Sequence, residues 1–218
     1  CIRDRLKDLE PTDFTKLLEI ALSSDVINIE GKLFEQRDGI AMGNSISPLV
    51  AIIYMHSVEH EILQKTKTRL FKRYIDDTFF VTSVSYEELL KAANSINPHI
   101  QFTLEQPVDN QIPFLDTLVR YNVELSSFTT TLYTKPIHSG HTLPFDAHVP
   151  TNRKYSTMFT EFYRALRVST TQEAEKESCR QIFVKFKANG YPTDMIRKAE
   201  RNAKRKTRNT VQRDNAQK

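Results

Sequence analysis

The sequence contains no tryptophan and only two cysteines among its 218 residues. Cys1 and Cys179 lie far apart, and neither has a cysteine or histidine neighbour at the spacing of a metal site. Such a pair does not indicate a disulfide framework or a zinc site, so we expect a reducing, intracellular setting. No apolar run has the length that a bilayer-spanning helix needs, so we expect no membrane partner.

The bulk composition is that of a soluble globular protein. Hydrophobic residues make up 39% of the chain and charged residues 27%, and the length is sufficient to bury a core. The sequence begins at Cys1 with what looks like the end of a helix, and it carries no leader-type segment. We therefore interpret it as a fragment of a longer polypeptide.

The net charge of +4 is distributed unevenly along the chain. The segment 197–218 contains nine lysines or arginines against two acids, whereas the rest of the chain has 22 against 25. Such a segment is either a solvated helix or linker, or a contact for nucleic-acid phosphates, and a nuclear-import signal is a further alternative. We select Lys204, Arg205 and Lys206 as candidate nucleic-acid contacts.

The spacing of apolar residues predicts helices and strands in alternation through the first part of the chain. Ser85 and Glu88 form a capping-box signature, which predicts a helix that stops near Asn97. The other elements predicted here are a helix over 12–23, a hairpin around Gly31, a loop over 39–48, a long helix after Pro48, and two strands that flank Asp76.

The second part of the chain reads as strands followed by helices. Strands are predicted in 100–105, 112–121 and 128–133, and we expect them to complete the sheet begun by the strands around Asp76. Helices are predicted from Asn152 onward. The order predicts an α+β fold, in which an antiparallel sheet packs on helices and a helical region follows.

The loop GIAMGNSISP, residues 39–48, consists mainly of small residues. Gly39 and Gly43 permit close approach of another molecule, Ser47 adds a hydroxyl group, and Pro48 can start the helix that follows. A helix N-terminus behind glycines suits a phosphate or nucleotide. Small-residue loops before helices are also common, so a purely structural role stays open for the loop alone.

The stretch KRYIDDTFFV, residues 72–81, places Asp76 and Asp77 between two strand-like runs. Aspartate is depleted in strands, so the pair forms a tight turn, concentrates negative charge for chemistry, or does both. Carboxylates are the ligands that Mg²⁺ prefers, and two Mg²⁺ ions roughly 4 Å apart can activate a hydroxyl group and stabilise a leaving pyrophosphate. Together with the glycine loop, the acid pair predicts polymerase chemistry.

These two segments resemble motifs of reverse transcriptases, whose motif C is Tyr-X-Asp-Asp and whose motif B is a glycine loop that ends in Ser-Pro. The sequence is most similar to the reverse transcriptases of Penelope-like retroelements, over nearly the whole chain. The stretches that carry the resemblance are GIAMGNSISP (39–48), RYIDDTF (73–79), IQFTLE (100–105), PFLD (113–116), YTKPIH (133–138) and NGYP (189–192).

The resemblance implies roles for individual residues. Asp76 binds both metal ions, Mg²⁺ or Mn²⁺, and Asp77 supports this catalytic site, while Tyr74 lies beneath the growing primer end. The implied contacts to the nucleotide and template are Gly39, Met42, Gly43, Asn44, Ser47 and Pro48. The implied primer-grip and nucleic-acid contacts are Phe114, Leu115, Asp116 and Lys135.

The resemblance also implies a division of the chain into a partial palm over 1–137, a helical thumb-like region over 138–196 and a basic tail or linker over 197–218. The implied partners are an RNA template, a DNA primer and dNTP, in the nucleus. Members of the family carry fingers and a third metal-binding aspartate, in motif A, upstream of the matching segment, and a GIY-YIG endonuclease often follows it. We therefore expect this fragment alone to be inactive as a polymerase.

The glycine loop departs from the family pattern at two positions, and two other functions stay open for the chain. Asn44 and Ser45 stand where the family has Ser-Pro, and loss of the proline frees the backbone of the loop. The alternative from a different class is a non-catalytic nucleic-acid-binding remnant of a decayed element. A metal-dependent hydrolase or nuclease that uses Asp76 and Asp77 is a third reading.

Overall fold

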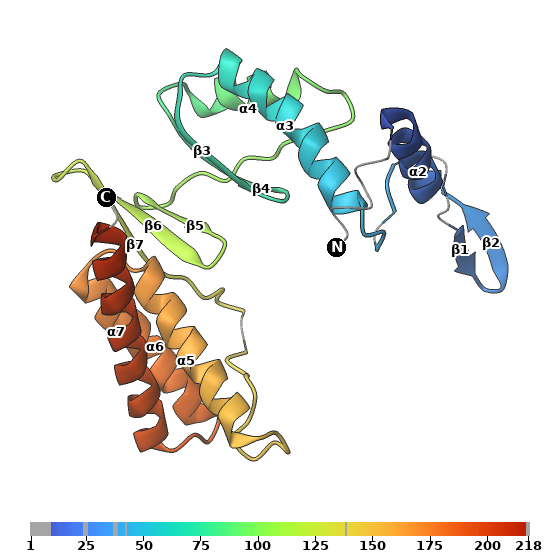
Figure 1. Cartoon of the computed structure of the whole chain (residues 1–218). Helices are drawn as coiled ribbons and strands as arrows, with labels where there is room; N and C mark the ends of the chain where they lie inside the picture. Colours follow the sequence, from blue (N-terminus) through green and yellow to red (C-terminus); the bar gives the residue numbers. More distant parts are fainter. Residues whose placement is uncertain (1–9, 24–25, 37–38, 42, 138, 217–218) are drawn as a thin grey trace. The chain divides into compact units, whose positions relative to one another are not determined.

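The chain divides into two compact units, Cys1–Leu104 and Glu105–Lys218 (Figure 1). The computed structural model describes residues 10–23, 26–36, 39–41, 43–137 and 139–216, with side chains given as far as residue 210. Helices alternate with short antiparallel sheets, which confirms the predicted α+β class. The division predicted from the sequence, at residues 137/138, is a different boundary. It marks the change from strand pattern to helix pattern, and it stays a prediction.

The first unit contains three helices and two hairpins among its described residues, and each was predicted by the pattern. Glu30 and Gly31 form the turn of the first hairpin with φ of 51° and 81°, the two positive values that a tight two-residue turn requires. The elements are α2 (Pro11–Ser23), β1 (Val26–Ile29), β2 (Lys32–Glu35), α3 (Ser47–Lys65), β3 (Thr68–Tyr74), β4 (Asp77–Thr82) and α4 (Tyr86–Asn94).

Helix α4 begins at the predicted capping box. The Ser85 hydroxyl accepts a hydrogen bond from the Glu88 amide at 3.2 Å, and the Glu88 carboxylate accepts one from the Ser85 amide at 3.3 Å. Its apolar face packs on α3, and Ala93 of α4 forms a small buried cluster with Val58 and Ile62 of α3. This cluster is the core of the first unit.

The prediction of a strand over 100–105 is wrong. The segment has no strand partner, because the Asn94 side chain bonds both the amide and the carbonyl of Phe102, at 2.7 and 3.1 Å. Asn94 thereby replaces the neighbouring strand that an extended segment would otherwise need. Ile100 and Phe102 instead cover the core cluster of the first unit.

The predicted single sheet is also wrong, since the strands pair in three separate antiparallel sheets. Strands β1 and β2 form one hairpin, β3 and β4 a second, and β5 to β7 a three-stranded sheet in the second unit. Without a strand at 100–105 the β3–β4 pair has no neighbour in the described chain that continues its hydrogen-bond ladder. The elements of the second unit are β5 (Gln111–Phe114), β6 (Thr117–Asn122), β7 (Ser127–Leu132), α5 (Thr151–Val168), α6 (Gln172–Ala188) and α7 (Thr193–Ala216).

Helices α5, α6 and α7 lie side by side and build the main core (Figure 1). Ile196, Ala199 and Ala203 of α7 are fully buried in it, so the beginning of the basic segment, as far as Ala203, packs as a helix against the core. Gly190 ends α6 with a φ of 82°, at the predicted Asn189–Gly190 stop. Burial raises the pKa of the Cys179 thiol in this core to about 11.

A buried hydroxyl group fastens the three-stranded sheet to the helices. The Ser178 hydroxyl is fully buried and accepts a hydrogen bond from the Leu132 amide of β7 at 3.1 Å. It also lies 3.0 Å from the Thr131 hydroxyl and 2.9 Å from the Ser169 hydroxyl. The sheet and the bundle are therefore joined by a fully hydrogen-bonded polar contact within an apolar core.

None of the helices in the described chain is long and apolar enough to cross a membrane.

We predict that Ser178→Ala lowers the free energy of unfolding by about 1–3 kcal/mol, because it leaves the half-buried Leu132 amide without its acceptor. Urea unfolding followed by helical circular dichroism measures the loss. Ser156→Ala is the matched control, since Ser156 is exposed on α5 and its hydroxyl bonds only the Asn152 carbonyl of its own helix. Equal effects of the two substitutions would contradict the proposed link.

Candidate functional site

The acid pair lies at the turn of the β3–β4 hairpin. Tyr74 pairs with Asp77, so Ile75 and Asp76 are the two turn residues. Tyr74, Asp76 and Asp77 are all exposed, which leaves both carboxylates accessible. The sequence therefore correctly located a tight turn with two accessible acids.

The turn is strained. Ile75 has a φ of 58°, in the left-handed region, and its side chain branches at Cβ, where this conformation costs about 1–2 kcal/mol. The Arg73 guanidinium holds the turn by donating to the Ile75 carbonyl at 2.9 Å. Arg73 is itself fixed by an ion pair with Glu59 of α3, in which both side chains are only 12–13% exposed. The sequence analysis did not identify Glu59 and Arg73 as the residues that position the turn, because two residues 14 positions apart form no recognisable sequence motif.

Hydrogen bonds from polar side chains of the glycine loop hold its conformation. The Asn44 amide donates to the Ala21 carbonyl at 2.6 Å and its oxygen accepts from the Ile46 amide at 3.0 Å. The Ser47 hydroxyl donates to the Ala41 carbonyl at 2.8 Å. Asn44 thus ties the loop to α2 at the position where the resembling family has a serine.

The remaining loop residues differ in exposure. Gly39 and Gly43 have φ of 82° and 108° and are exposed, which is the backbone freedom predicted for them. Pro48 lies in the first turn of α3 and is exposed. Met42 lies outside the described residues.

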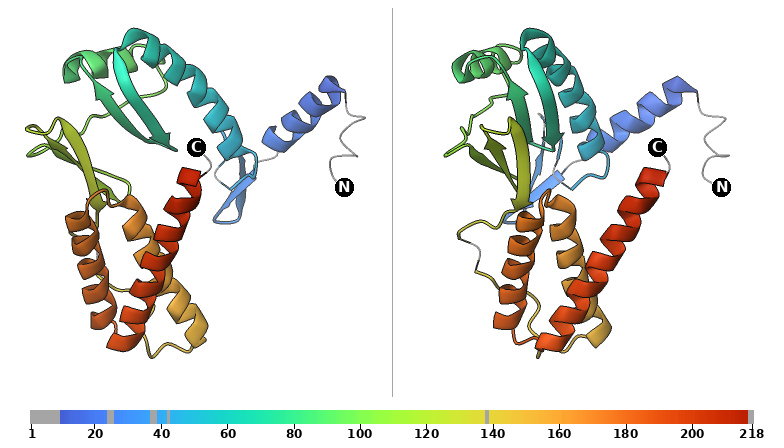
Figure 2. Two further views of the ribbon diagram at one scale, coloured as in Figure 1. Left: turned by 60° about the vertical axis from the view of Figure 1, so that its left-hand side comes forward. Right: turned by 90° about the vertical axis from the view of Figure 1, so that its left-hand side faces the viewer.

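The loop and the acid pair are positioned by the same helix. Ser47 begins α3, and Glu59, which holds Arg73, follows twelve residues later, a rise of about 18 Å. The hairpin turn points toward the N-terminal end of α3 in every view (Figure 1 and Figure 2). Across the described chain, no three His, Cys, Asp or Glu side chains are grouped so that they could hold a metal ion.

The predicted primer-grip residues lie in the second unit. Phe114 ends β5, and Leu115 and Asp116 form the turn into β6. The Asp116 carboxylate makes an ion pair with Arg164 of α5, and the Asp116 carbonyl accepts from the Tyr133 amide at 2.7 Å. This turn is therefore fastened to the helices. Lys135 is exposed in the segment after β7.

The three basic residues selected in the tail lie in different environments on α7. Lys204 is half-buried and makes an ion pair with Glu200; burial lowers its pKa, but the hydrogen bond and charge of Glu200 outweigh this, and the pKa is raised. Lys206 lies over the rings of Phe159 and Tyr163. Arg205 is exposed, and no ion pair or hydrogen bond is formed by it within the described chain.

Other cations of α7 form an exposed surface that sequence reasoning did not single out. Arg197, Arg201 and Arg208 are exposed and recur at a spacing that places them on one face of the helix, here named the arginine face. The buried Ile196, Ala199 and Ala203 define the opposite side. The spacing of these apolar residues is the signal from which an amphipathic helix could have been predicted.

A family model, the animal helix-turn-helix domain, matches residues 141–201. The match covers α5, α6 and the first part of α7, and the turn between α6 and α7 contains Gly190. Helix-turn-helix regions use two helices joined by a short turn to bind DNA, so the match indicates a nucleic acid as partner. No curated protein and no solved structure matches the chain.

We predict that Ile75→Gly raises the free energy of unfolding by about 0.5–1 kcal/mol, because relief of the left-handed strain exceeds the chain entropy that glycine loses on folding. Ile75→Ala is the control, since alanine keeps a Cβ atom and therefore most of the strain. Urea unfolding of the full chain provides the measurement. Equal effects of glycine and alanine would show that the turn is not strained.

Proposed function

We propose that this chain is the palm-and-thumb segment of an RNA-directed DNA polymerase of a Penelope-like retroelement. In this proposal it transfers nucleotides from dNTPs to a primer 3′ hydroxyl group on an RNA template. The proposal rests on the turn of the β3–β4 hairpin. In this turn the strained residue Ile75 directly precedes Asp76 and Asp77. Backbone strain of this kind persists where surrounding contacts impose it, and it gathers at functional sites. Arg73 and Glu59 are those contacts.

Asp76 and Asp77 fit a Mg²⁺ ion in their ligand chemistry, because both are exposed carboxylates with oxygen donors of the kind that Mg²⁺ and Mn²⁺ prefer. Bound metal would activate the primer hydroxyl group and stabilise the leaving pyrophosphate. Two carboxylates do not complete a two-metal site. In the proposal, the third comes from the motif A segment of the same polypeptide, together with the fingers.

The glycine loop and the second unit take supporting roles in the proposal. Gly39, Gly43 and Pro48 are exposed at the start of α3 and contact the nucleotide or template. The arginine face of α7 contacts the primer–template duplex through its phosphates. A nuclear location and a following GIY-YIG endonuclease belong to the same proposal, by analogy with the resembling family.

A second candidate is a nucleic-acid-binding protein without catalytic activity. It is favoured by the positions of the cations on α7 and the helix-turn-helix match, which are independent of the acid pair. In this candidate Asp76 and Asp77 form only a solvated turn. The two candidates differ in whether Asp76 is needed for nucleotide incorporation.

We predict that Asp76→Asn reduces template-directed dNTP incorporation by at least roughly a hundredfold when the chain is joined to its motif A segment, since even the outer partners of metal ligands contribute tenfold to a hundredfold. Asp109→Asn is the matched control, because Asp109 is also an exposed aspartate in a turn. Activity that survives Asp76→Asn would overturn the catalytic assignment and leave the second candidate.

We predict that Arg197→Gln combined with Arg201→Gln weakens binding of the full chain to duplex nucleic acid. The slope of log K against log salt should fall by about 1 for each phosphate that the variant no longer neutralises. Point substitutions are needed because deletion of α7 would remove Ile196, Ala199 and Ala203 from the core. Fluorescence anisotropy over a salt series measures the slope. An unchanged slope would contradict phosphate binding by the arginine face.

A further inference from the structure

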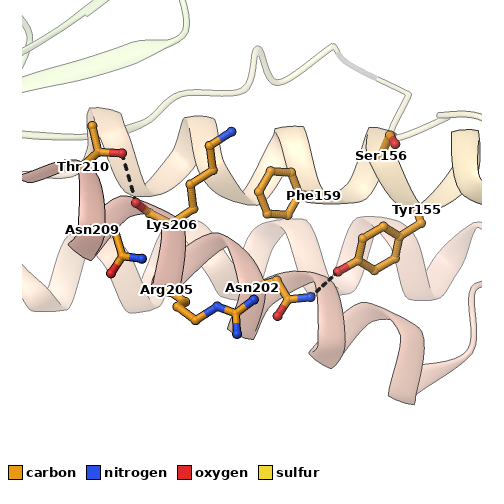
Figure 3. A pocket seen from close by; sticks show the side chains of 8 residues that line it. All are labelled: Tyr155, Ser156, Phe159, Asn202, Arg205, Lys206, Asn209 and Thr210. Atoms are coloured by element: carbon orange, nitrogen blue, oxygen red, sulfur yellow. Dashed lines mark hydrogen bonds between the residues drawn. The ribbon is translucent and has the colours of Figure 1, made fainter.

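A groove of about 520 Å³ runs between α5 and α7 on the surface of the second unit. Figure 3 shows the Phe159 ring between Lys206 and Tyr155, with Asn202, Arg205 and Asn209 along α7. We name it the α5–α7 groove; its lining residues are Tyr155, Ser156, Phe159, Asn202, Arg205, Lys206, Asn209 and Thr210. Arg205 borders the arginine face, since it lies one turn after Arg201 and one turn before Arg208; the other lining residues belong neither to that face nor to the acid-pair turn.

One wall of the groove is aromatic. Tyr155 and Phe159 are four residues apart on α5, and Tyr163 follows at the same spacing, so the three rings lie along one face of the helix. The Phe159 and Tyr163 rings are parallel within 7°, with centroids 6.1 Å apart. The ammonium group of Lys206 lies over both rings, 5.5 Å from the Phe159 centroid and 5.0 Å from the Tyr163 centroid.

The other wall, on α7, consists of polar side chains. Arg205 and Asn209 are exposed and form no ion pair or hydrogen bond within the described chain. Asn202 is already oriented, since its amide donates to the Tyr155 hydroxyl at 2.7 Å. The groove thus combines aromatic rings, two cations and the free amide group of Asn209.

We propose that the α5–α7 groove is a second nucleic-acid site that accepts a single strand. Ring faces and edges attract bases, and Arg205 and Lys206 neutralise phosphates, which is the combination by which proteins bind single strands. In a duplex the base faces are stacked on each other and cannot reach Phe159 or Tyr155. The inference rests on the nucleic-acid binding of the proposed function but does not require polymerase activity.

The first test compares two arginines of α7 that differ in location and not in charge. Fluorescence anisotropy of the full chain uses a labelled single-stranded oligothymidylate and a labelled duplex of the same length. We expect Arg205→Gln, in the groove, to lower affinity for the single strand roughly fivefold more than Arg197→Gln, on the arginine face about 12 Å farther along α7. For the duplex, Arg205→Gln should lower affinity no more than Arg197→Gln. Equal losses for the single strand would overturn the inference.

The second test removes stacking without removing charge. Phe159→Leu keeps an apolar side chain against the core, and we expect it to lower affinity for the oligothymidylate about fivefold or more with an unchanged salt slope. Thermal unfolding by circular dichroism confirms that the variant is folded; if it is not, the Arg205→Gln comparison decides.

If the unsubstituted chain binds neither probe, the proposed nucleic-acid function fails as well. If it binds both and the folded groove variants retain full single-strand affinity, only the groove assignment is overturned.

Discussion

The close packing of α7 against α5 and α6 is the constraint on which the second unit depends. Ala199 and Ala203 are fully buried, and their small side chains let the helices approach closely around Phe162 and Phe186. Because this side of α7 is occupied by apolar residues, its cations are distributed over the remaining sides. The arginine face and the α5–α7 groove are therefore two consequences of one packing arrangement.

The first unit is organised around charge and not around a large core. Its buried cluster is small, and the ion pair between Arg73 and Glu59 connects α3 to the hairpin that carries the acid pair. Breaking a largely buried pair leaves an uncompensated charge, which makes the pair a strong positional restraint even where its net contribution to stability is modest. The strained conformation of Ile75 is held by that restraint through the hydrogen bond from Arg73 to its carbonyl.

Local patterns predicted local structure well. The capping box at Ser85, the tight turn at Gly31 and the turn at Asp76 depend on residues within a few positions of one another, and all three formed as expected. The strand predicted over 100–105 failed because a side chain eight residues away, Asn94, supplied the hydrogen bonds that a neighbouring strand would have given. Lys204 stays a predicted nucleic-acid contact, but the sequence analysis did not anticipate that Glu200, one turn earlier on α7, forms an ion pair with it.

The sequence by itself determined the α+β class, the exposed acid turn and the concentration of positive charge near residue 200, because propensity, periodicity and composition act over short distances. Only the tertiary structure decided that Glu59 reaches Arg73, that Ser178 joins the sheet to the helices, and that Phe159 faces Lys206. Each of these interactions joins residues 14 to 47 positions apart. Such interactions depend on how helices pack and strands pair, and no local rule of spacing specifies them.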